Sequence, residues 1–257
     1  MGTIPSDIWN LRNLVTLNLA RNKLSGLIPP ELGKLRNLIE LDLSDNSFIG
    51  PIPVEIGQLN NLKHLSLGEN KLNGSIPLEI GNLNNLLILD LNTNSLTEVI
   101  LQDLHNLTSL TELNLSNNEI FNLIPQKLSQ LTQLNGEIPY QLGSVKYTRI
   151  LDLSYNELNG TIPRSLVSLG RLDLSYNSLE GEIPVALQKS FPPKAFTGND
   201  NLCGDIAHFA SCYYSSPHKS LMKIFLPLTA LLALLCTAYV FLRWCKAGNC
   251  IVSGLVE

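Results

Sequence analysis

The chain has 257 residues, of which 44% are hydrophobic and 16% are charged, and its formal net charge is -4. A weakly acidic chain of this kind gives no reason to expect nucleic-acid binding, which favours basic surfaces. Its length is sufficient for one elongated domain in which successive repeats bury their leucines against one another.

Residues 1–192 carry a repeated frame built around asparagine. Leucine-like residues stand eight, five and three positions before each asparagine, except that Thr148 replaces the first of them before Asn156. Five copies are evenly spaced, at Asn22, Asn46, Asn70, Asn94 and Asn118, and two follow at altered spacing, at Asn156 and Asn177. A period of about 20 to 29 residues with this pattern predicts a leucine-rich-repeat solenoid. We therefore expect an α/β right-handed superhelix of about nine coils, with a parallel β-sheet on its concave side.

Each part of the frame has a predicted structural role. The Leu-x-Leu pair alternates with polar residues, which predicts a short strand with one buried face. We expect the asparagine to be buried, with its amide bonded to backbone groups of its own turn and of the neighbouring coil. In the Gly-x-Ile-Pro element that follows, glycine permits a positive φ or a close backbone approach, and proline is expected to bend the coil away from regular pairing. A short helical turn is predicted on the convex side.

Two intervals depart from the period. The interval from Asn118 to Asn156 is ten positions short of two periods, so we predict that the coil near 134–147 lacks its sheet strand. The interval from Asn156 to Asn177 is three positions short of one period, and a second irregularity is expected near 166–172.

The segment after the repeats carries a pair of cysteines. Cys203 and Cys212 lie nine residues apart in a stretch rich in glycine, aspartate and serine. A disulfide between them would indicate an oxidising compartment, and two free thiols are the alternative. Zinc is not expected, because only His208 lies between them and no set of four ligands is evident. We assign residues 193–219 to a C-terminal cap.

An apolar run follows the cap. The segment from Ile224 to Leu242 contains no charged residue. At about 1.5 Å per residue a helix over this segment spans roughly 28 Å, close to the hydrocarbon thickness of a bilayer. We predict a transmembrane helix in residues 220–243 and a short cytoplasmic tail in 244–257, and a buried core helix is the alternative. Basic residues flank both ends, so charge alone does not fix the orientation.

Sequons favour an extracellular location for the repeats. The candidate glycosylation sites are Asn73, Asn106, Asn114 and Asn159. No signal peptide is visible, and the first residues fit the second half of a repeat. We therefore expect a truncated product or gene model.

The Gly-x-Ile-Pro element is the most specific motif of the repeats. Copies include Leu72-Asn-Gly74-Ser-Ile76-Pro77 and Leu158-Asn-Gly160-Thr-Ile162-Pro163. This combination resembles the plant extracellular leucine-rich-repeat family, the receptor-like kinases and receptor-like proteins, and the run from Ala195 to Cys203 looks like that family's C-terminal cap. The resemblance implies a single-pass plasma-membrane protein whose N-terminal part is extracellular. It also implies a peptide or protein ligand and a co-receptor kinase as partners.

Strand alternation predicts which side chains face a ligand. Positions six, four and two residues before each asparagine point outward from the sheet, and the position just before the asparagine adjoins them. The candidate ligand-binding residues are Glu40, Asp42, His64, Asp90, Glu112, Asp152, Tyr155, Arg171, Asp173 and Tyr176. For the aspartates the alternative is that they only solvate the sheet. The tyrosines are favoured because aromatic residues are enriched at binding hot spots.

No catalytic motif is present in the sequence. It contains no glycine-rich phosphate loop, metal-ligand motif or Ser-His-Asp set in a plausible frame, so no enzyme activity, cofactor or metal is expected. The leading hypothesis is a membrane-anchored recognition module that signals through a partner kinase. One alternative is a fragment of an ATP-dependent serine/threonine receptor kinase. Another is a wall-associated inhibitor of a pathogen enzyme, although the membrane segment argues against that role.

Overall fold

The structure, a computed structural model, describes residues 2–97, 107–121, 138, 142–143 and 149–212. These residues fall within one unit that spans Met1–Cys212. The predicted membrane segment 220–243, the predicted tail 244–257 and the last residues of the predicted cap lie outside the described residues. In the part of the chain that is described, no helix is long and apolar enough to cross a membrane.

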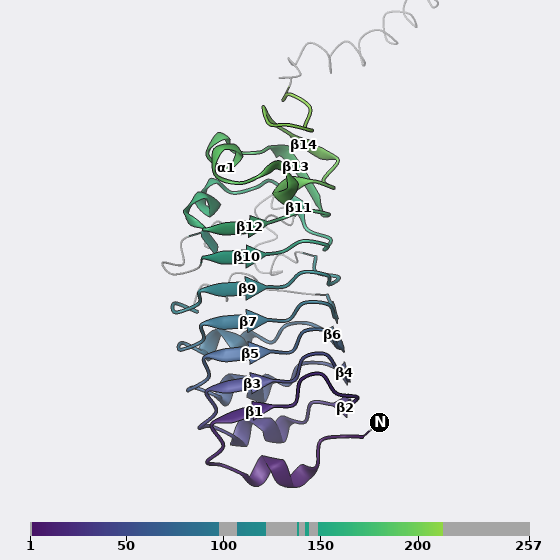
Figure 1. The fold of residues 1–257 in the computed structure, drawn as a ribbon, viewed down its shortest axis with the longest axis vertical. Coiled ribbons are helices and arrows are strands. Elements are labelled where there is room, and N and C mark those ends of the chain that lie inside the picture. Colours follow the sequence, from purple (N-terminus) through teal and green to yellow (C-terminus); the bar gives the residue numbers. More distant parts are fainter. Residues whose placement is uncertain (1, 98–106, 122–137, 139–141, 144–148, 213–257) are drawn as a thin grey trace, which may run out of the picture. The chain divides into compact units, whose positions relative to one another are not determined.

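Seven coils each contribute one strand to a parallel main sheet (Figure 1). In order across the sheet, its seven strands are β1 (Thr16–Asn18), β3 (Glu40–Asp42), β5 (His64–Ser66), β7 (Ile88–Asp90), β9 (Glu112–Asn114), β10 (Ile150–Asp152) and β12 (Arg171–Asp173). The central residue of each strand is buried and its two neighbours are more exposed, as the alternation of the frame predicts.

Further parallel sheets form after the asparagine of each coil. One contains β2 (Ser25–Leu27), β4 (Ser47–Gly50), β6 (Lys71–Gly74) and β8 (Ser95–Leu96). Another contains β11 (Asn159–Gly160), β13 (Ser178–Glu182) and β14 (Asn201–Cys203). These strands were not predicted, whereas the prolines leave regular pairing as expected. β2, β4, β6, β11 and β13 each end before an Ile-Pro step, so the missing proline N–H falls outside the ladder.

Helical turns follow the prolines and complete the coils. They are η1 (Ser6–Asn10), η2 (Pro30–Lys34), η3 (Val54–Gln58), η4 (Leu78–Asn82), η8 (Arg164–Ser168), α1 (Val185–Ser190) and η9 (Pro193–Phe196). Most are 3-10 turns of five residues. All but α1 are preceded by a proline in extended conformation, which fits the N-terminal boundary of a helical turn.

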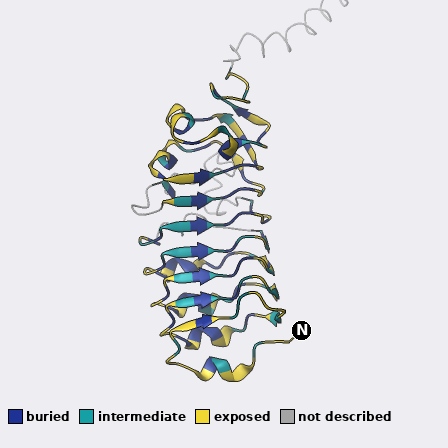
Figure 2. Cartoon of the chain, viewed as in Figure 1, coloured by how far each residue is buried: buried dark blue, intermediate teal, exposed yellow. Residues whose placement is uncertain are grey.

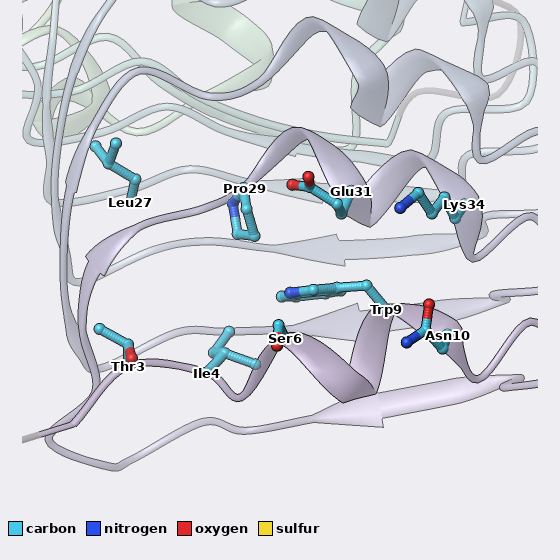
Figure 3. Close-up of a pocket in the computed structure, with 9 residues that line it drawn as sticks. All are labelled: Thr3, Ile4, Ser6, Trp9, Asn10, Leu27, Pro29, Glu31 and Lys34. Atoms are coloured by element: carbon cyan, nitrogen blue, oxygen red, sulfur yellow. The ribbon is translucent and has the colours of Figure 1, made fainter.

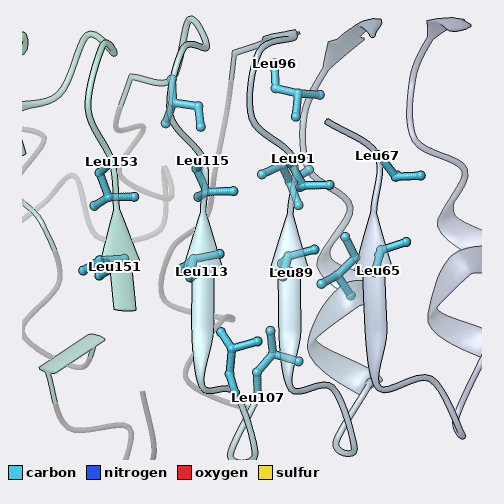
Figure 4. Packing of buried hydrophobic residues seen from close by; sticks show 14 of the residues in the cluster. Leu65, Leu67, Leu89, Leu91, Leu96, Leu107, Leu113, Leu115, Leu151 and Leu153 are labelled. Atoms are coloured by element: carbon cyan, nitrogen blue, oxygen red, sulfur yellow. The ribbon is translucent and has the colours of Figure 1, made fainter. Parts of the chain in front are cut away.

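The leucines of successive coils form one hydrophobic core. Leu41, Leu65 and Leu89 stand at equivalent strand centres and are each 0% exposed. In Figure 4 the leucines of β5, β7, β9 and β10 lie in parallel rows, and Figure 2 shows the buried strand centres in dark blue. Each coil buries its apolar side chains against its neighbours. The hydrophobic core therefore exists only when the coils are stacked.

The frame asparagines tie neighbouring coils together. The Asn70 Nδ2 donates to the carbonyls of Leu43 in the preceding coil and of Leu67 and Gly68 in its own turn, each at 3.1 Å. Its Oδ1 accepts the Phe48 N–H at 3.0 Å. The expected bonding to the turn and the neighbouring coil is therefore observed, but Asn70 is only half-buried, so the expected burial is wrong for it.

We call this series of hydrogen bonds between frame asparagines and neighbouring coils the asparagine ladder, and each coil that takes part in it a rung. The ladder extends one rung past the predicted repeats. Asn199 donates to the carbonyls of Leu174 and Phe196 at 3.0 and 2.9 Å, and it accepts the Leu179 N–H at 3.0 Å. The sequence had placed Asn199 in the cap, and the structure gives it the role of a frame asparagine. Beyond it, Cys203 and Cys212 form a disulfide.

The sheet passes directly from β9 to β10 despite the long sequence separation. Leu113 is the register partner of Leu151, and the Asn156 Nδ2 donates to the Leu115 carbonyl at 2.9 Å. No strand therefore stands between β9 and β10 in the sheet, as the shortened spacing suggested. Most residues of the coil near 134–147 lie outside the described residues. In the shortened coil that leads to Asn177, η8 is followed by an extended Leu169 that continues into β12.

Candidate ligand-binding face

The register of the main sheet aligns the predicted outward positions into two columns. The outer column contains Thr16, Glu40, His64, Ile88, Glu112, Ile150 and Arg171. The middle column contains Asn18, Asp42, Ser66, Asp90, Asn114, Asp152 and Asp173. We call this surface the open face. It brings eight of the ten candidate residues onto one side of one sheet, and the two tyrosines adjoin it.

The middle-column aspartates also accept hydrogen bonds from the turn that follows their strands. The Asp173 Oδ1 accepts the Ser175 N–H at 3.0 Å and the Ser175 hydroxyl at 2.6 Å. Asp42 and Asp152 make the same pair of bonds with the serine two residues later. Sequence analysis weighed ligand binding against solvation for these acids and missed this local role. The serine at the i+2 position was the signal, because such side chains often close Asx-type turns.

Acidic residues concentrate around Asp90. Burial raises the pKa of Asp90 above its usual value of 3.8, while the hydrogen bond from the Asn92 N–H lowers it. The carboxylates of Glu112, Glu69 and Asp42 raise the pKa of Asp90 further. This part of the open face therefore carries negative potential that favours a cationic ligand.

The residue before each frame asparagine has left-handed backbone geometry. These residues are Arg21, Asp45, Glu69, Thr93, Asn117, Tyr155 and Tyr176, with φ between 50° and 57°. We call them the turn column. Asparagine and glycine tolerate this region, whereas other residues pay a steric cost of about 1 kcal/mol. Backbone hydrogen bonds to the neighbouring coils hold these residues in place, and their side chains project at the edge of the open face.

Tyr155 and Tyr176 form a stacked pair in the turn column. Their ring centroids are 4.3 Å apart with an interplanar angle of 12°. They are 49% and 50% exposed, so about half of each side chain is open to solvent. The pKa of Tyr155 is raised, first by partial loss of hydration and then by Tyr176 and Asp173.

The remaining predicted residues lie apart from this pair. His64 is half-buried on β5 between Glu40 and Ile88 of the neighbouring strands. Arg171 is exposed at the opposite end of its short strand from Tyr176. Across the described residues, no group of three or more His, Cys, Asp or Glu side chains is arranged to hold a metal. The arrangement is suited to contact with a partner along the sheet.

The sequons fall on different surfaces. Asn73 on β6 and Asn159 on β11 are exposed, and both lie on the sheets that follow the frame asparagine. Asn114 lies in the middle column of the open face, and its Oδ1 accepts bonds from the Ser116 N–H and hydroxyl. A glycan at Asn114 would cover the candidate face. Asn106 lies outside the described residues.

A groove away from the open face separates η1 from η2 (Figure 3). It has a volume of about 470 Å³ and is lined by residues that include Trp9, Leu27 and Pro29. Trp9 occupies the position that glycine holds in the next three coils, at Gly33, Gly57 and Gly81. A Cβ at Gly33 would lie 2.8 Å from the Glu55 Cβ, so the turns pack tightly there, whereas the indole stands between η1 and η2. Tryptophan at a glycine position was the signal that sequence analysis missed.

Comparison with known families and structures agrees with this geometry. The Leucine Rich Repeat family model matches residues 13–35, 37–59, 61–83, 109–131, 147–169 and 168–190, which together cover just over half of the chain. The chain belongs to the leucine-rich repeat family. A search of curated proteins found no match.

Solved structures similar to this leucine-rich repeat protein include plant receptor ectodomains. The ectodomain of the Arabidopsis thaliana membrane receptor kinase GASSHO1/SCHENGEN3, in complex with CASPARIAN STRIP INTEGRITY FACTOR 2, is 39% identical with a TM-score of 0.66, and the match covers 82% of this chain and 27% of that one. The Arabidopsis receptor kinase HAESA, in complex with the peptide hormone IDA and the co-receptor SERK1, is 37% identical with a TM-score of 0.71, covering 81% and 33%. The predicted resemblance to plant receptors is confirmed.

The fold is also similar to that of a protein with a different function. A plant ice-binding protein is 28% identical with a TM-score of 0.53, and the match covers 84% of this chain and 81% of that one. The leucine-rich repeat protein spans about a third or less of the two receptor ectodomains it matches.

Proposed function

We propose that this leucine-rich repeat protein is a plant recognition module that binds a peptide or protein ligand on its open face and signals through a partner kinase. The observation that carries the proposal is the open face itself. Seven strands hold two aligned columns of outward side chains, and the stacked tyrosines stand at their edge. A broad polar face with exposed aromatic anchors is the kind of surface that protein and peptide partners use.

The receptor neighbours support the ligand class. HAESA and GASSHO1/SCHENGEN3 were crystallised with a peptide hormone and with CASPARIAN STRIP INTEGRITY FACTOR 2, and HAESA also with a co-receptor. By analogy, the candidate contacts are Glu40, His64, Glu112 and Arg171 in the outer column, with the middle-column acids and the tyrosines beside them. The proposal assigns no phosphotransfer to this chain.

Membrane anchoring is part of the proposal and rests on the sequence. The uncharged run from Ile224 to Leu242 would anchor the protein in the plasma membrane, with the disulfide and the exposed sequons Asn73 and Asn159 outside. Fractionation of plant cells expressing the full chain tests this assignment. Membrane retention after carbonate washing is expected, and release into the wash would contradict it.

Peptide selection tests the binding role directly. The full chain, held in phosphatidylcholine nanodiscs, is used to select from a displayed library of random dodecapeptides. The Ser66→Trp variant places a bulky side chain on the open face at β5, and Lys71→Trp places the same side chain on exposed β6. Selected peptides are expected to bind the parent and Lys71→Trp alike and to bind Ser66→Trp about tenfold more weakly.

Two outcomes would contradict the binding proposal. One is a failure to enrich any peptide, and the other is equal binding by Ser66→Trp. A pull-down with the SERK1 ectodomain tests the co-receptor class, and no retention at micromolar concentration would count against it. Phosphotransfer from ATP by the purified chain would overturn the assignment of signalling to a partner.

A further inference from the structure

The stacked tyrosines are exposed groups whose backbone is fixed by bonds between coils. The Tyr155 N–H donates to the Ser175 carbonyl at 2.9 Å, and the Tyr176 N–H donates to the Thr197 carbonyl at 2.7 Å. The backbone beneath both rings is therefore fixed by the same ladder that joins the coils. A ligand that uses these rings does not have to order them first, which reduces the entropic cost of binding.

One end of the stack is closed by Gly198. This glycine has φ 72° and is the next member of the turn column, directly before Asn199. A Cβ at this position would lie 2.6 Å from the Tyr176 Cδ1 and 2.9 Å from its Cγ. Tyr176 therefore lies against bare backbone on one side and against Tyr155 on the other.

At the other end the column continues with a small side chain. The Asn117 N–H donates to the Ser154 carbonyl at 3.0 Å, so Asn117 occupies the adjacent rung of the turn column. Both it and Tyr155 are exposed. Half of the Tyr155 surface thus remains open to solvent at the edge of the open face.

Two carboxylates that have no cationic partner among the described residues lie on the strands next to the rings. Asp152 and Asp173 lie in the middle column of the two strands that lead to Tyr155 and Tyr176. Each uses Oδ1 for the serine two residues later, and within the described residues the Oδ2 of each makes no hydrogen bond or ion pair. Asp173 is close enough to Tyr155 to raise its pKa, which supports an electrostatically negative site.

We propose that the Tyr155–Tyr176 pair, with Asp173 and Asp152 as counter-charges, binds an arginine side chain of the peptide ligand. This assignment rests on the proposed peptide-binding function and names the chemistry of one contact. A guanidinium stacks on an aromatic ring through its planar face and still donates N–H groups to carboxylates at its edge. Lysine would satisfy the charge without the planar stacking. A neutral proline or sugar ring would use the aromatic surface and leave both carboxylates unpaired.

The test uses the full chain in nanodiscs with ring-labelled tyrosine, observed by NMR. The probes are acetyl-Ala-Arg-Ala-amide and the same peptide with citrulline, which is close in shape but uncharged. The resonances of the stacked rings are expected to shift at about millimolar arginine peptide, and the citrulline peptide should bind at least about fivefold more weakly.

Three variants locate the effect. Tyr155→Asn is expected to abolish the shift of the Tyr176 resonances with the arginine peptide. Asparagine suits this backbone position, because Asn117 has the same left-handed geometry. Asp173→Asn should weaken arginine binding about threefold while keeping the bonds to Ser175, because Asn114 makes the equivalent bonds to Ser116. Thr93→Asn changes the same column without touching the pair and serves as the control.

The outcomes separate this proposal from the broader one. Equal shifts with arginine and citrulline, or no shift at either ring, would overturn the arginine assignment. If selected peptides bind the open face without moving the tyrosine resonances, peptide recognition stands and this contact fails. If the arginine probe shifts the rings but no selected peptide is blocked by Ser66→Trp, the contact stands and the face-wide binding role fails.

Discussion

The strands from β1 to β9 and those from β10 onward follow different spacings but make the same bonds. In the first region the frame asparagines are evenly spaced, whereas the interval lengthens between Asn118 and Asn156 and shortens before Asn177. In both regions each Nδ2 donates to the carbonyl three residues before the previous frame asparagine. Asn118 donates to Leu91, Asn156 to Leu115, and Asn177 to Leu153. The hydrogen bonds between neighbouring coils are therefore the same in both regions, whereas the number of residues between successive frame asparagines varies.

Removing one asparagine from each region should break the ladder equally. Asn94→Ala loses the bonds to Leu67 and the acceptor of the Leu72 N–H, and Asn156→Ala loses the equivalent bonds, including the acceptor of the Ile120 N–H. Each variant leaves several part-buried groups unpaired, so each should cost about 3 kcal/mol. Urea unfolding and hydrogen exchange at the two orphaned amides measure the effect. A much smaller cost for Asn156→Ala would mean that the second region is held together differently.

Close packing of the helical turns gives a second comparison of the two regions. A Cβ at Gly57 would overlap the Glu79 carbonyl oxygen, and a Cβ at Gly143 would overlap the Ser165 carbonyl. Because both obstacles are backbone atoms, Gly57→Ala and Gly143→Ala should each destabilise the protein by about 2 kcal/mol. Gly2→Ala, with nothing within 4 Å of the added atom, is the neutral control for the thermal melts. A wild-type melting temperature for either test variant would refute the tight packing.

The turn column should respond differently in the two regions. Thr93 is a β-branched residue with φ 51°, so Thr93→Asn should stabilise the protein by about 0.5–1 kcal/mol. Tyr155→Asn relieves the same backbone strain but loses ring stacking worth about 0.5–1.5 kcal/mol, so little net change is expected. Chemical denaturation of both variants measures the difference. A clear gain in stability for Tyr155→Asn would show that the stack contributes nothing to folding.

The smallest expected effect is a change in the pH dependence of stability, and it involves Asp90 in the first region. Because the pKa of Asp90 is raised in the folded state, the native protein holds this proton more tightly than the unfolded chain. Stability attributable to Asp90 therefore falls as pH rises from below 3.8 through the folded-state pKa. Asp90→Asn should be slightly more stable than the parent at neutral pH, and the difference should vanish in acid. Melting temperatures measured from acid to neutral pH would contradict this account if the two curves stayed parallel.

The sequence predicted those features that depend on repeated local patterns. Leucine spacing predicted the strands, and alternation predicted the two columns of the open face, because side-chain direction follows directly from strand geometry. The bonding of residues such as Asn70 followed from the donors and acceptors that an asparagine amide must pair when it is taken out of water, although Asn70 itself is only half-buried. The direct pairing of β9 with β10 followed from counting residues between asparagines.

Other features had no reliable sequence signal. Arg21, Glu69 and Thr93 share no chemistry that favours left-handed geometry, and the neighbouring ladder imposes it on them. The stacking of Tyr155 on Tyr176 depends on that imposed geometry and on Gly198. The role of Asn199 was hidden because η9 replaces the strand that usually precedes a frame asparagine. These features arise from contacts between coils, which a single repeat does not encode.

The turn column also bears on how such a surface can diversify. Its backbone is held by bonds to carbonyls in the same and adjacent coils, so arginine, aspartate, glutamate, threonine and tyrosine all occupy one geometry. A mutation there exchanges the projecting group at a modest, predictable energetic penalty and leaves the scaffold unchanged. Single substitutions in the turn column could therefore change the ligand preference without any rearrangement of the buried leucines.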